Sequence, residues 1–331
     1  MPPKRTPSMA VKLAEAARLV QSGTPYAEAA AQVGVGTTTL WRYVTEEGGD
    51  SYALLERECR TILQRAYKSV QDRGLVGAKF PCRLIFLDDL HIPFTDFRVI
   101  REVLEREGEA DILVTFEVIN FDSFSRFDQE YLGDPGLEEV LALAVLSNLR
   151  NAFKRVVCGT SNHMTRPQKS IMRGFRPEQQ EYIRDRLTSV FDALRELRIE
   201  HVNSSILQVG DSVFGHYDRT LSTPGKTAER LRERCRAMHD IVGVSKHPAG
   251  VFTGHTHRVS QTPSGSDYNF EVGCATYAPP YSLEHGKSGA LGSYRMAVGY
   301  GVAEFDRDGR INYAHSRSVP LGWARLPEEV R

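Results

Sequence analysis

Histidine and carboxylate residues recur at short spacing along this chain, each time directly after a short apolar run. The four places are Gly254-His255-Thr256-His257, Asp89-Leu90-His91, Asn162-His163 and Gly215-His216. Short apolar runs favour buried strands, so several strand ends could bring imidazole, carboxylate and amide ligands to one rim. A mixed ligand set of this kind is typical of a two-metal centre that holds divalent Mn, Fe or Zn and cleaves phosphoesters.

The elements that would carry these residues alternate between strands and helices from Cys82 onward. Predicted strands cover residues 83–87, 112–116, 155–158, 205–209, 251–253, 268–272 and 296–305. Predicted helices cover residues 97–107, 137–153 and 179–197, where apolar residues recur at helical spacing. Residues 306–310 predict a hairpin turn. This alternation predicts a mixed α/β layered domain.

The N-terminal residues have a different pattern, with short alanine-rich helices predicted at 9–22, 26–33 and 37–44. Thr24 is predicted to cap the second helix, with Pro25 as its first residue. The segment resembles a helix-turn-helix: Ala30 fits the small contact position, Gly34 the turn, and Leu40 a buried position behind it. The residues expected on the exposed side of the recognition helix, where they can meet phosphates and base edges, are Thr37, Thr38, Thr39, Trp41 and Arg42.

Charge gives this segment modest support as a DNA-binding element, because residues 1–45 hold five basic residues against two acidic ones. A small helical module for protein interaction or oligomerisation is the alternative. A polar, glycine-bearing break at 46–50 and a charged helix over 52–71 follow it. We therefore predict a helix-turn-helix module at 1–48, a helical linker at 49–79 and a catalytic domain at 80–331.

Composition is that of an ordinary globular protein: 41% of the 331 residues are apolar, 25% are charged, and the formal net charge is zero. Neither a disordered nor a fibrous chain is indicated, and any site for a polyanion must be local. The five cysteines are scattered and never in CxxC spacing, which predicts reduced thiols. With no signal peptide and no 18-residue apolar run, we expect a cytoplasmic protein that does not associate with membranes.

Over residues 80–316 the order of elements and motifs resembles the calcineurin-like metallophosphoesterase superfamily. The resemblance implies a four-layer α/β/β/α sandwich, in which two mixed sheets are flanked by helices and two divalent metals lie at the strand ends. Together with the N-terminal helices, the predicted fold is this α/β sandwich with a small all-α helix-turn-helix domain. Manganese is the expected metal, and Fe, Zn, Ni or Mg also suit the ligands.

The resemblance assigns the first two motifs to the end of the first and second strands. Asp89 and His91 match the D-x-H motif and should bind the first metal. The second motif is normally G-D, with an aspartate that bridges both metals, whereas this chain has Phe116-Glu117. Glutamate can still bridge two cations, but its extra methylene shifts the carboxylate, and we expect Phe116 to crowd the turn. Asn120 falls at a polar supporting position, and residues 122–128 are expected to form a loop near the substrate.

The third motif, G-N-H-E in the family, is Ser161-Asn162-His163-Met164 in this chain. The resemblance implies that Asn162 binds the second metal, and that His163 faces the scissile phosphate and protonates the leaving oxygen or stabilises its charge. Met164 replaces the usual acid, and Arg166 is a candidate for holding phosphate.

The remaining motifs supply three imidazoles. His216 matches the single histidine of the fourth motif and should bind the second metal. In the fifth motif, which matches the family without change, His255 should bind the second metal and His257 the first. Because ligating imidazoles must be neutral, we expect activity to fade below about pH 6.5. The histidines that match no motif are expected to be ordinary surface or loop residues: His201, His239, His247, His285 and His315.

The sequence thus favours a metal-dependent phosphodiesterase or nuclease that acts on DNA and is recruited by its N-terminal module. The segment 271–274 and the hairpin at 308–310 look most like phage or mobile-element members of the family. Two alternatives remain open at this stage: a phosphatase or phosphodiesterase for nucleotides or phosphoproteins, and a DNA-binding or scaffold protein whose metal site has decayed. A homo-oligomer is compatible with each of them.

Overall fold

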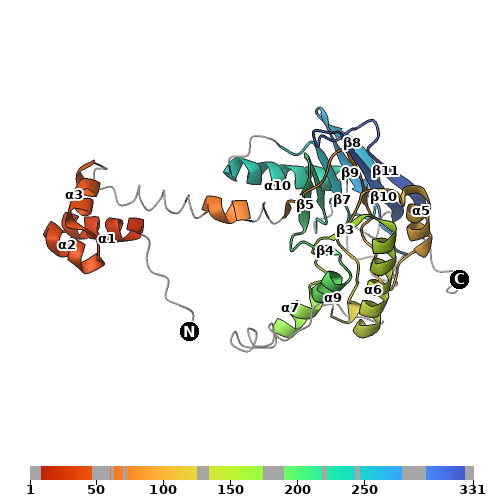
Figure 1. The fold of residues 1–331 in the computed structure, drawn as a ribbon, viewed down its shortest axis with the longest axis horizontal. Coiled ribbons are helices and arrows are strands. Elements are labelled where there is room, and N and C mark those ends of the chain that lie inside the picture. Colours follow the sequence, from red (N-terminus) through yellow and green to blue (C-terminus); the bar gives the residue numbers. More distant parts are fainter. Residues whose placement is uncertain are drawn as a thin grey trace. The chain divides into compact units, whose positions relative to one another are not determined.

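The computed structural model describes residues 9–46, 60, 63–69, 72, 74–124, 134–173, 190–217, 221, 223–242, 247–277 and 296–324. The chain divides into two units, residues 1–69 and 70–331, which are described separately (Figure 1). The predicted segments 1–48, 49–79 and 80–331 remain a prediction. Of the predicted linker helix at 52–71, residues 60 and 63–69 are described and are helical; the others lie outside the described residues.

The first unit is built from α1 (Met9–Gln21), α2 (Tyr26–Val33) and α3 (Thr37–Glu46), close to the predicted ranges. Its core consists mainly of small side chains, which let the helices approach one another closely. The buried members are Ala14, Ala16, Ala17, Ala29, Ala30, Leu40 and Tyr43. Because alanine has the highest helix propensity, the same residues favour both the helices and their close packing.

The start of α2 differs from the predicted cap. Pro25 takes the N-cap position with extended backbone angles, and no side chain caps the helix, so Thr24 does not have the predicted role. The carbonyl oxygen of Pro25 accepts the first helical hydrogen bond, from the amide of Ala29 at 2.9 Å. The helix ends as predicted at Gly34, whose φ of 70° lies in the left-handed region that glycine adopts without strain.

The second unit contains a six-stranded sheet in the order β11-β10-β1-β2-β3-β4. Its strands are β1 (Cys82–Phe86), β2 (Ile112–Thr115), β3 (Arg155–Cys158), β4 (Glu200–His201), β10 (Ala297–Phe305) and β11 (Arg317–Trp323). Strands β1 to β4 are parallel, and β10 and β11 join as antiparallel strands. The carboxyl ends of β1, β2 and β3 therefore lie at the same edge.

A five-stranded sheet follows the order β5-β6-β7-β9-β8. Its strands are β5 (Ile206–Val209), β6 (Ser212–Gly215), β7 (Gly250–Thr253), β8 (Val259–Ser264) and β9 (Asp267–Val272). Strands β6, β7 and β9 are parallel, and β5 and β8 pair with them as antiparallel hairpin partners. Beside β5, the amide of Val76 donates to the carbonyl of Gln208 at 2.9 Å.

Aromatic side chains from both sheets fill one shared core. Phe86 of β1 lies 5.7 Å from Phe214 of β6, measured between ring centroids, and the rings of Phe252 and Phe270 stack at 4.2 Å. All four side chains are fully buried. Each such ring removes 150–250 Å² from water, so this core holds the two sheets together.

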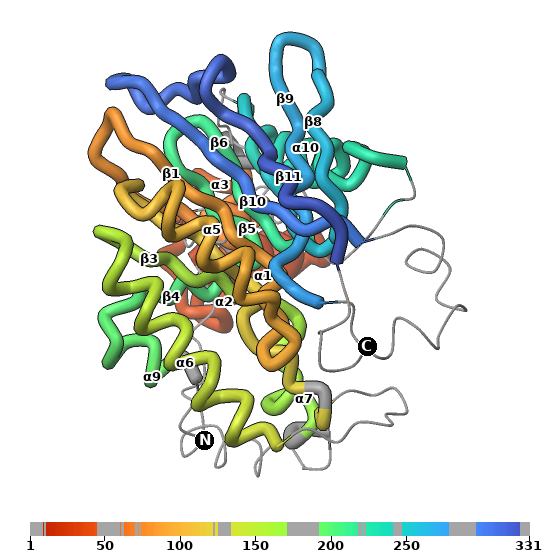
Figure 2. Tube along the Cα trace, turned by 90° about the vertical axis from the view of Figure 1, so that its right-hand side faces the viewer, coloured from red at the N-terminus to blue at the C-terminus, as the bar shows by residue number. Residues whose placement is uncertain are grey.

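Helices cover the other face of each sheet (Figures 1 and 2). Helices α5 (Phe97–Glu107), α6 (Pro135–Ala152) and α9 (Val190–Glu196) contribute to the apolar cluster on the outer side of the six-stranded sheet. Helix α10 (Lys226–Val242) packs Leu231 and Cys235 against Val213 and Val251 of the five-stranded sheet. The predicted mixed α/β architecture is confirmed.

Several elements depart from the prediction. Helix α10 and strands β4, β8 and β11 were not predicted, and the short helices η1 (Asp122–Phe124) and α7 (Arg166–Arg173) add to them. The predicted helix at 179–197 is described only over α9, and the rest of it, like residues 125–128 of the predicted loop, lies outside the described residues. Among the helices described, none has the length and apolar character that a membrane span requires.

Candidate metal centre

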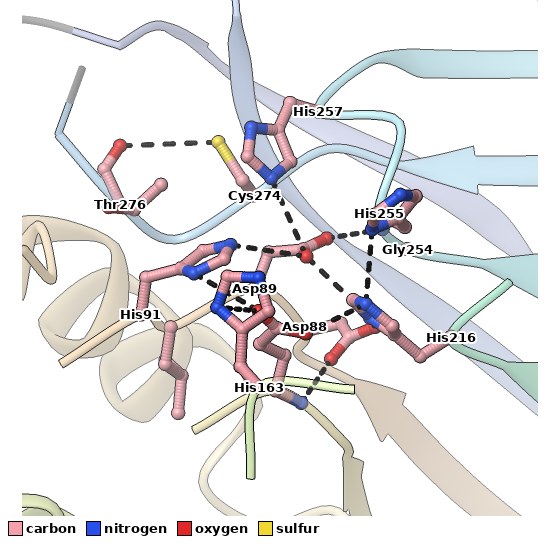
Figure 3. A network of polar contacts seen from close by, with 12 residues as sticks. Asp88, Asp89, His91, His163, His216, Gly254, His255, His257, Cys274 and Thr276 are labelled. Atoms are coloured by element: carbon pink, nitrogen blue, oxygen red, sulfur yellow. Dashed lines mark hydrogen bonds and ion pairs between the residues drawn. The ribbon is translucent and has the colours of Figure 1, made fainter. Parts of the chain in front are cut away.

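Side chains from five strand ends meet at one rim where the two sheets adjoin (Figure 3). Asp89 and His91 follow β1, Glu117 follows β2 and His163 comes after β3. His216 follows β6, and His255 and His257 follow β7. Ligands bind outside the carboxyl ends of parallel strands because the following loops converge there, and this centre has that location in both sheets.

Three groups of these residues have ligand atoms within 4.8 Å of one another, the spacing that could hold a metal ion. The groups are Asp89 with His91 and His257, Asp89 with His216 and His255, and Glu117 with His91 and His163. The first two match the predicted division between the metals, His91 and His257 on one side and His216 and His255 on the other. Asp89 belongs to both groups, although it was predicted for the first metal alone.

The Asp89 carboxylate is the centre of the arrangement. Its Oδ1 lies 3.5 Å from Nε2 of His257 and 3.6 Å from both Nε2 of His91 and Nδ1 of His216. These separations are long for hydrogen bonds. The distances to His257 and His91 match two ligand atoms that share one ion, because bonds of about 2.1 Å at a tetrahedral angle place such atoms roughly 3.4 Å apart.

Glu117 is also fully buried and reaches the histidines of both groups. Its Oε1 lies 2.7 Å from Nδ1 of His163 and 3.2 Å from Nδ1 of His91, and its Oε2 lies 2.8 Å from Nε2 of His216. Neither oxygen has the alignment of a hydrogen bond with any residue that the structure describes. One oxygen thus faces each side of the centre, which is the placement that a bridging carboxylate needs.

Four of the candidate ligands have left-handed backbone angles. The φ values are 54° for Asp89, 46° for His91, 66° for His255 and 50° for His257. Residues with a Cβ rarely adopt this conformation, and each instance costs about 1 to 3 kcal/mol. Such strain persists only where the surrounding structure holds it, and it concentrates at functional sites. The D-x-H and H-x-H segments therefore share a local geometry as well as a spacing.

Phe116 does not crowd the turn as predicted. Its ring is fully buried and contacts Phe86 edge-on, with ring centroids 5.9 Å apart. The space is provided by Gly159, where a Cβ would lie 2.1 Å from Cε1 of Phe116. The large residue in the second motif is thus matched by a glycine after β3, a compensation that depends on tertiary contact.

The residues of the third motif hold one another. Nδ1 of His163 lies 2.9 Å from Oδ1 of Asn120, and its Nε2 lies 2.7 Å from Nη2 of Arg166. Arg166 also donates from Nη1 to the backbone oxygen of Asn120 at 2.9 Å. Asn120 therefore has the supporting position that was predicted. Met164 is buried in the apolar core, so the polar contacts of His163 come from Asn120, Arg166 and Glu117 instead.

Burial and opposite charges determine the protonation of the centre. Burial lowers the pKa of His163 to about 3, and burial together with His216 lowers that of His255 to about 4. Burial opposes ionisation of Asp89 and Glu117, but the surrounding histidines hold both carboxyl pKa values well below the usual range. Glu117 raises the pKa of His91 and of His216 against the effect of burial.

The donor set fits a divalent cation. Of the 14 buried side-chain atoms without a hydrogen-bond partner among the described residues, six belong to the predicted ligands: Oδ1 of Asp89, both oxygens of Glu117, Nε2 of His91, Nδ1 of His257 and Oδ1 of Asn162. An unsatisfied buried polar atom costs about 1 to 3 kcal/mol, so this concentration at one place indicates a ligand that satisfies them. Carboxylate, imidazole and amide donors together suit divalent first-row metals.

One carboxylate was missed in the sequence. Asp88, fully buried and next to Asp89, contacts the loops after β2 and β6 (Figure 3). An acidic residue beside the D-x-H motif at a buried strand end was the available signal.

The five residues predicted to contact DNA lie on α3 in the other unit, and all are exposed: Thr37, Thr38, Thr39, Trp41 and Arg42. Their neighbour Leu40 is buried, so α3 has an inner and an outer face as predicted. DNA binding by the outer face stays a prediction.

Of the residues outside the motifs, His201 lies on β4 beside Thr160, with Nε2 3.1 Å from the hydroxyl oxygen. His239 is buried on α10, so it is not the surface or loop residue that was predicted, and its ring stacks on that of His247. His247 and His315 are exposed as predicted, and His285 lies outside the described residues. The four described cysteines are buried free thiols: Cys82, Cys158, Cys235 and Cys274.

Comparison with protein families and with curated proteins finds no match to this chain. Among solved structures it is similar to wild-type Vps29 from Entamoeba histolytica complexed with Zn²⁺, at 12% identity and a TM-score of 0.35 over 72% of this chain and 98% of the other. It is similar to an archaeal phosphodiesterase, at 10% identity and a TM-score of 0.34 over 70% and 97%. It is also similar to a predicted phosphoesterase from Streptococcus pneumoniae, at 15% identity and a TM-score of 0.28 over 74% and 99%. Likenesses at this level assign no activity to this chain.

Proposed function

We propose that the larger unit is a metal-dependent phosphoric ester hydrolase with the four-layer calcineurin-like metallophosphoesterase fold. One observation carries this proposal: six of the seven predicted ligands, from four strand ends, lie together, and the two buried carboxylates among them present three oxygens without a hydrogen-bond partner among the described residues. The seventh, Asn162, has a buried amide oxygen that also lacks a hydrogen-bond partner among the described residues. Packing alone would not leave so many polar atoms unsatisfied in one place.

We divide the ligands between two divalent cations. His91 and His257 would hold one cation, and His216, His255 and Asn162 would hold the other. Asp89 and Glu117, which reach histidines of both sets, would be shared. Manganese is our first candidate, with Fe, Zn, Ni and Mg as further candidates. When bound, a metal pair supplies a hydroxide nucleophile near neutral pH and stabilises both the entering and the leaving oxygen.

The chain's own contribution is the binding and orientation of the phosphate. Arg166 presents a guanidinium next to the cluster, and guanidinium groups bind phosphate oxygens bidentately. We propose that Arg166 turns from His163 to the phosphate when substrate binds. Nε2 of His163, which faces Arg166 at 2.7 Å, is then free to hold a proton for the leaving oxygen.

We propose DNA as the substrate, with the N-terminal unit acting as a helix-turn-helix that recruits the enzyme. The exposed hydroxyl groups of α3, with Trp41 and Arg42, support this reading, as does the excess of basic residues before position 45. Phosphate contacts from such side chains supply most of the affinity of non-specific DNA binding.

The test incubates the full chain with Mn²⁺ and, in parallel, single-stranded DNA, double-stranded DNA and a chromogenic phosphodiester. Cleavage of DNA, together with weaker DNA binding by Arg42→Ala at unchanged hydrolysis of the small diester, is the expected result. Hydrolysis of the small diester with all DNA intact would leave a phosphoesterase and exclude the nuclease. Absence of bound metal and of any hydrolysis would instead support a scaffold with a decayed site.

A further inference from the structure

Asp88 connects three loops of the metal centre through one fully buried carboxylate. Its Oδ1 accepts from the backbone amides of Phe116 at 3.1 Å and Glu117 at 2.9 Å, in the turn after β2. Its Oδ2 lies 3.0 Å from Nδ1 of His216, after β6. The loop after β7 also packs on it, because a Cβ at Gly254 would lie 2.1 Å from Oδ2.

The contact with His216 determines which nitrogen of that imidazole can bind a cation. A carboxylate oxygen accepts hydrogen bonds, so it keeps a proton on Nδ1 of His216. Nε2 then remains as the ligating atom, and it is this atom that lies 2.8 Å from Oε2 of Glu117 and 3.1 Å from Nδ1 of His255. The orientation of the ring follows from the same contact.

The contact between Asp88 and the turn after β2 positions a second candidate ligand, Glu117. Two hydrogen bonds from consecutive backbone amides to Asp88 fix the backbone from which the Glu117 side chain projects. Glu117 follows a strand of the six-stranded sheet, whereas His216 follows a strand of the five-stranded sheet. One side chain thus aligns a ligand of the six-stranded sheet with a ligand of the five-stranded sheet.

We propose that Asp88 is a positioning residue of the metal centre: it holds His216 with its proton on Nδ1 and aims Glu117 at the same cation. The inference rests on the proposed metal-dependent function and deepens it. Carboxylates that orient metal-binding histidines change metal affinity by 10- to 100-fold when they are replaced.

The direct test is Asp88→Asn, which keeps the shape of the side chain. In one orientation its amide nitrogen faces Nδ1 of His216 and donates, so that the imidazole proton moves to Nε2. In the other orientation the nitrogen faces the two backbone amides, which are also donors. We expect the Kd of one Zn²⁺ ion to rise roughly 10- to 100-fold, with the other ion less affected, measured by calorimetric titration of the full chain.

Asp96→Asn is the matched control. Asp96 is also buried, accepts from the backbone amide of Arg98 at 3.1 Å and begins α5, but it contacts none of the candidate ligands among the described residues. Its replacement should lower the melting temperature and leave both Zn²⁺ affinities unchanged. In a His216→Ala background, Asp88→Asn should lose most of its effect on zinc affinity, because its main target is gone.

A second measurement keeps the inference testable if Asp88→Asn does not fold. In wild-type protein loaded with Zn²⁺ and labelled with ¹⁵N-histidine, His216 should show a proton on Nδ1 and coordination through Nε2, assigned by comparison with His216→Gln. Coordination through Nδ1 would overturn the inference, and so would a Zn²⁺ affinity of Asp88→Asn within twofold of wild type. If wild-type protein binds no Zn²⁺ or Mn²⁺, the proposed function itself fails.

Discussion

The two sheets contribute differently to the metal centre. The six-stranded sheet supplies both carboxylates, Asp89 and Glu117, and the five-stranded sheet supplies imidazoles only, from His216, His255 and His257. The low pKa of the buried Asp89 carboxyl, against the effect of burial, depends first on His257, which comes from the other sheet. The charges of the centre are therefore balanced only when the two sheets pack together.

The carboxylate ligands of the six-stranded sheet and the imidazole ligands of the five-stranded sheet, the two halves of the centre, also differ in how many ligand groups each side chain belongs to. Asp89 belongs to two of the three ligand groups, and Glu117 faces His91 with one oxygen and His216 with the other. His255 and His257 each belong to one group. Replacing a carboxylate should consequently disturb both cations, and replacing one of these imidazoles should disturb one.

The largest effect is expected from removing the cations, which both halves share. Dialysis against a chelator should abolish phosphodiester hydrolysis, and Mn²⁺ should restore it. Because ligands that bind only the folded state stabilise it, the unfolding free energy should fall by about 3 kcal/mol for each ion that had been present at 100 times its Kd. Undiminished hydrolysis in the chelated protein, measured with the chromogenic diester, would contradict a metal mechanism.

Asp89→Asn tests the carboxylate half. The substitution keeps the size of the side chain but removes its charge from the centre of two ligand groups, so both cations should be lost. We expect kcat/KM to fall by roughly 1000-fold or more, since two-metal stabilisation contributes several kcal/mol to the rate. Metal content by mass spectrometry should drop from two ions to none, and retention of both ions would show that Asp89 is not shared.

His255→Gln is the matched test of the imidazole half. Because His255 belongs to one ligand group, about one ion per chain should remain, and kcat/KM should fall less than in Asp89→Asn. The measurement is again metal content alongside hydrolysis. Loss of both ions on this single replacement would remove the difference between the halves.

Glu117→Asp tests whether the longer acid is needed to span the two sides. Shortening the side chain withdraws the carboxylate from His91 or from His216, so we expect roughly a tenfold lower rate with one ion bound more weakly. Steady-state hydrolysis at several Mn²⁺ concentrations measures both effects. A higher rate than wild type would show that the native centre is detuned by its glutamate.

The smallest effect concerns the pH dependence of stability. The pKa of His163 is about 3 in the metal-free folded protein, against 6.5 for the ordinary imidazole. Between these values the unfolded chain binds a proton that the folded chain does not, so this group makes stability fall as pH decreases, by about 1.4 kcal/mol per pH unit. His163→Gln should reduce that slope, measured by urea unfolding in chelator at pH 5 and 6. The raised pKa values of His91 and His216 act in the opposite direction. Because wild type and His163→Gln both contain these two histidines, their contributions largely cancel when the two slopes are subtracted.

Local pattern was sufficient for many elements. The predicted helix at 97–107 and strand at 155–158 agree with α5 and β3, because an amphipathic repeat marks the helix and a short apolar run marks the strand. Helix α10 was missed because its charged residues obscure the apolar face that packs on β6 and β7. Strands β8 and β11 carry few buried residues, so their burial patterns give little period-2 signal.

Residue types and their spacing determined which side chains could serve as ligands and that they follow strands, because ligand chemistry and hydrophobic periodicity are properties of short segments. Tertiary structure alone decided how they are shared. Three contacts join residues far apart in the chain. Asp89 belongs to two ligand groups, Gly159 leaves space for the ring of Phe116, and Asp88 contacts His216. The contact between Gly159 and Phe116 requires β2 and β3 to be neighbours, and the other two arise only when the two sheets pack face to face, so no local pattern encodes any of them.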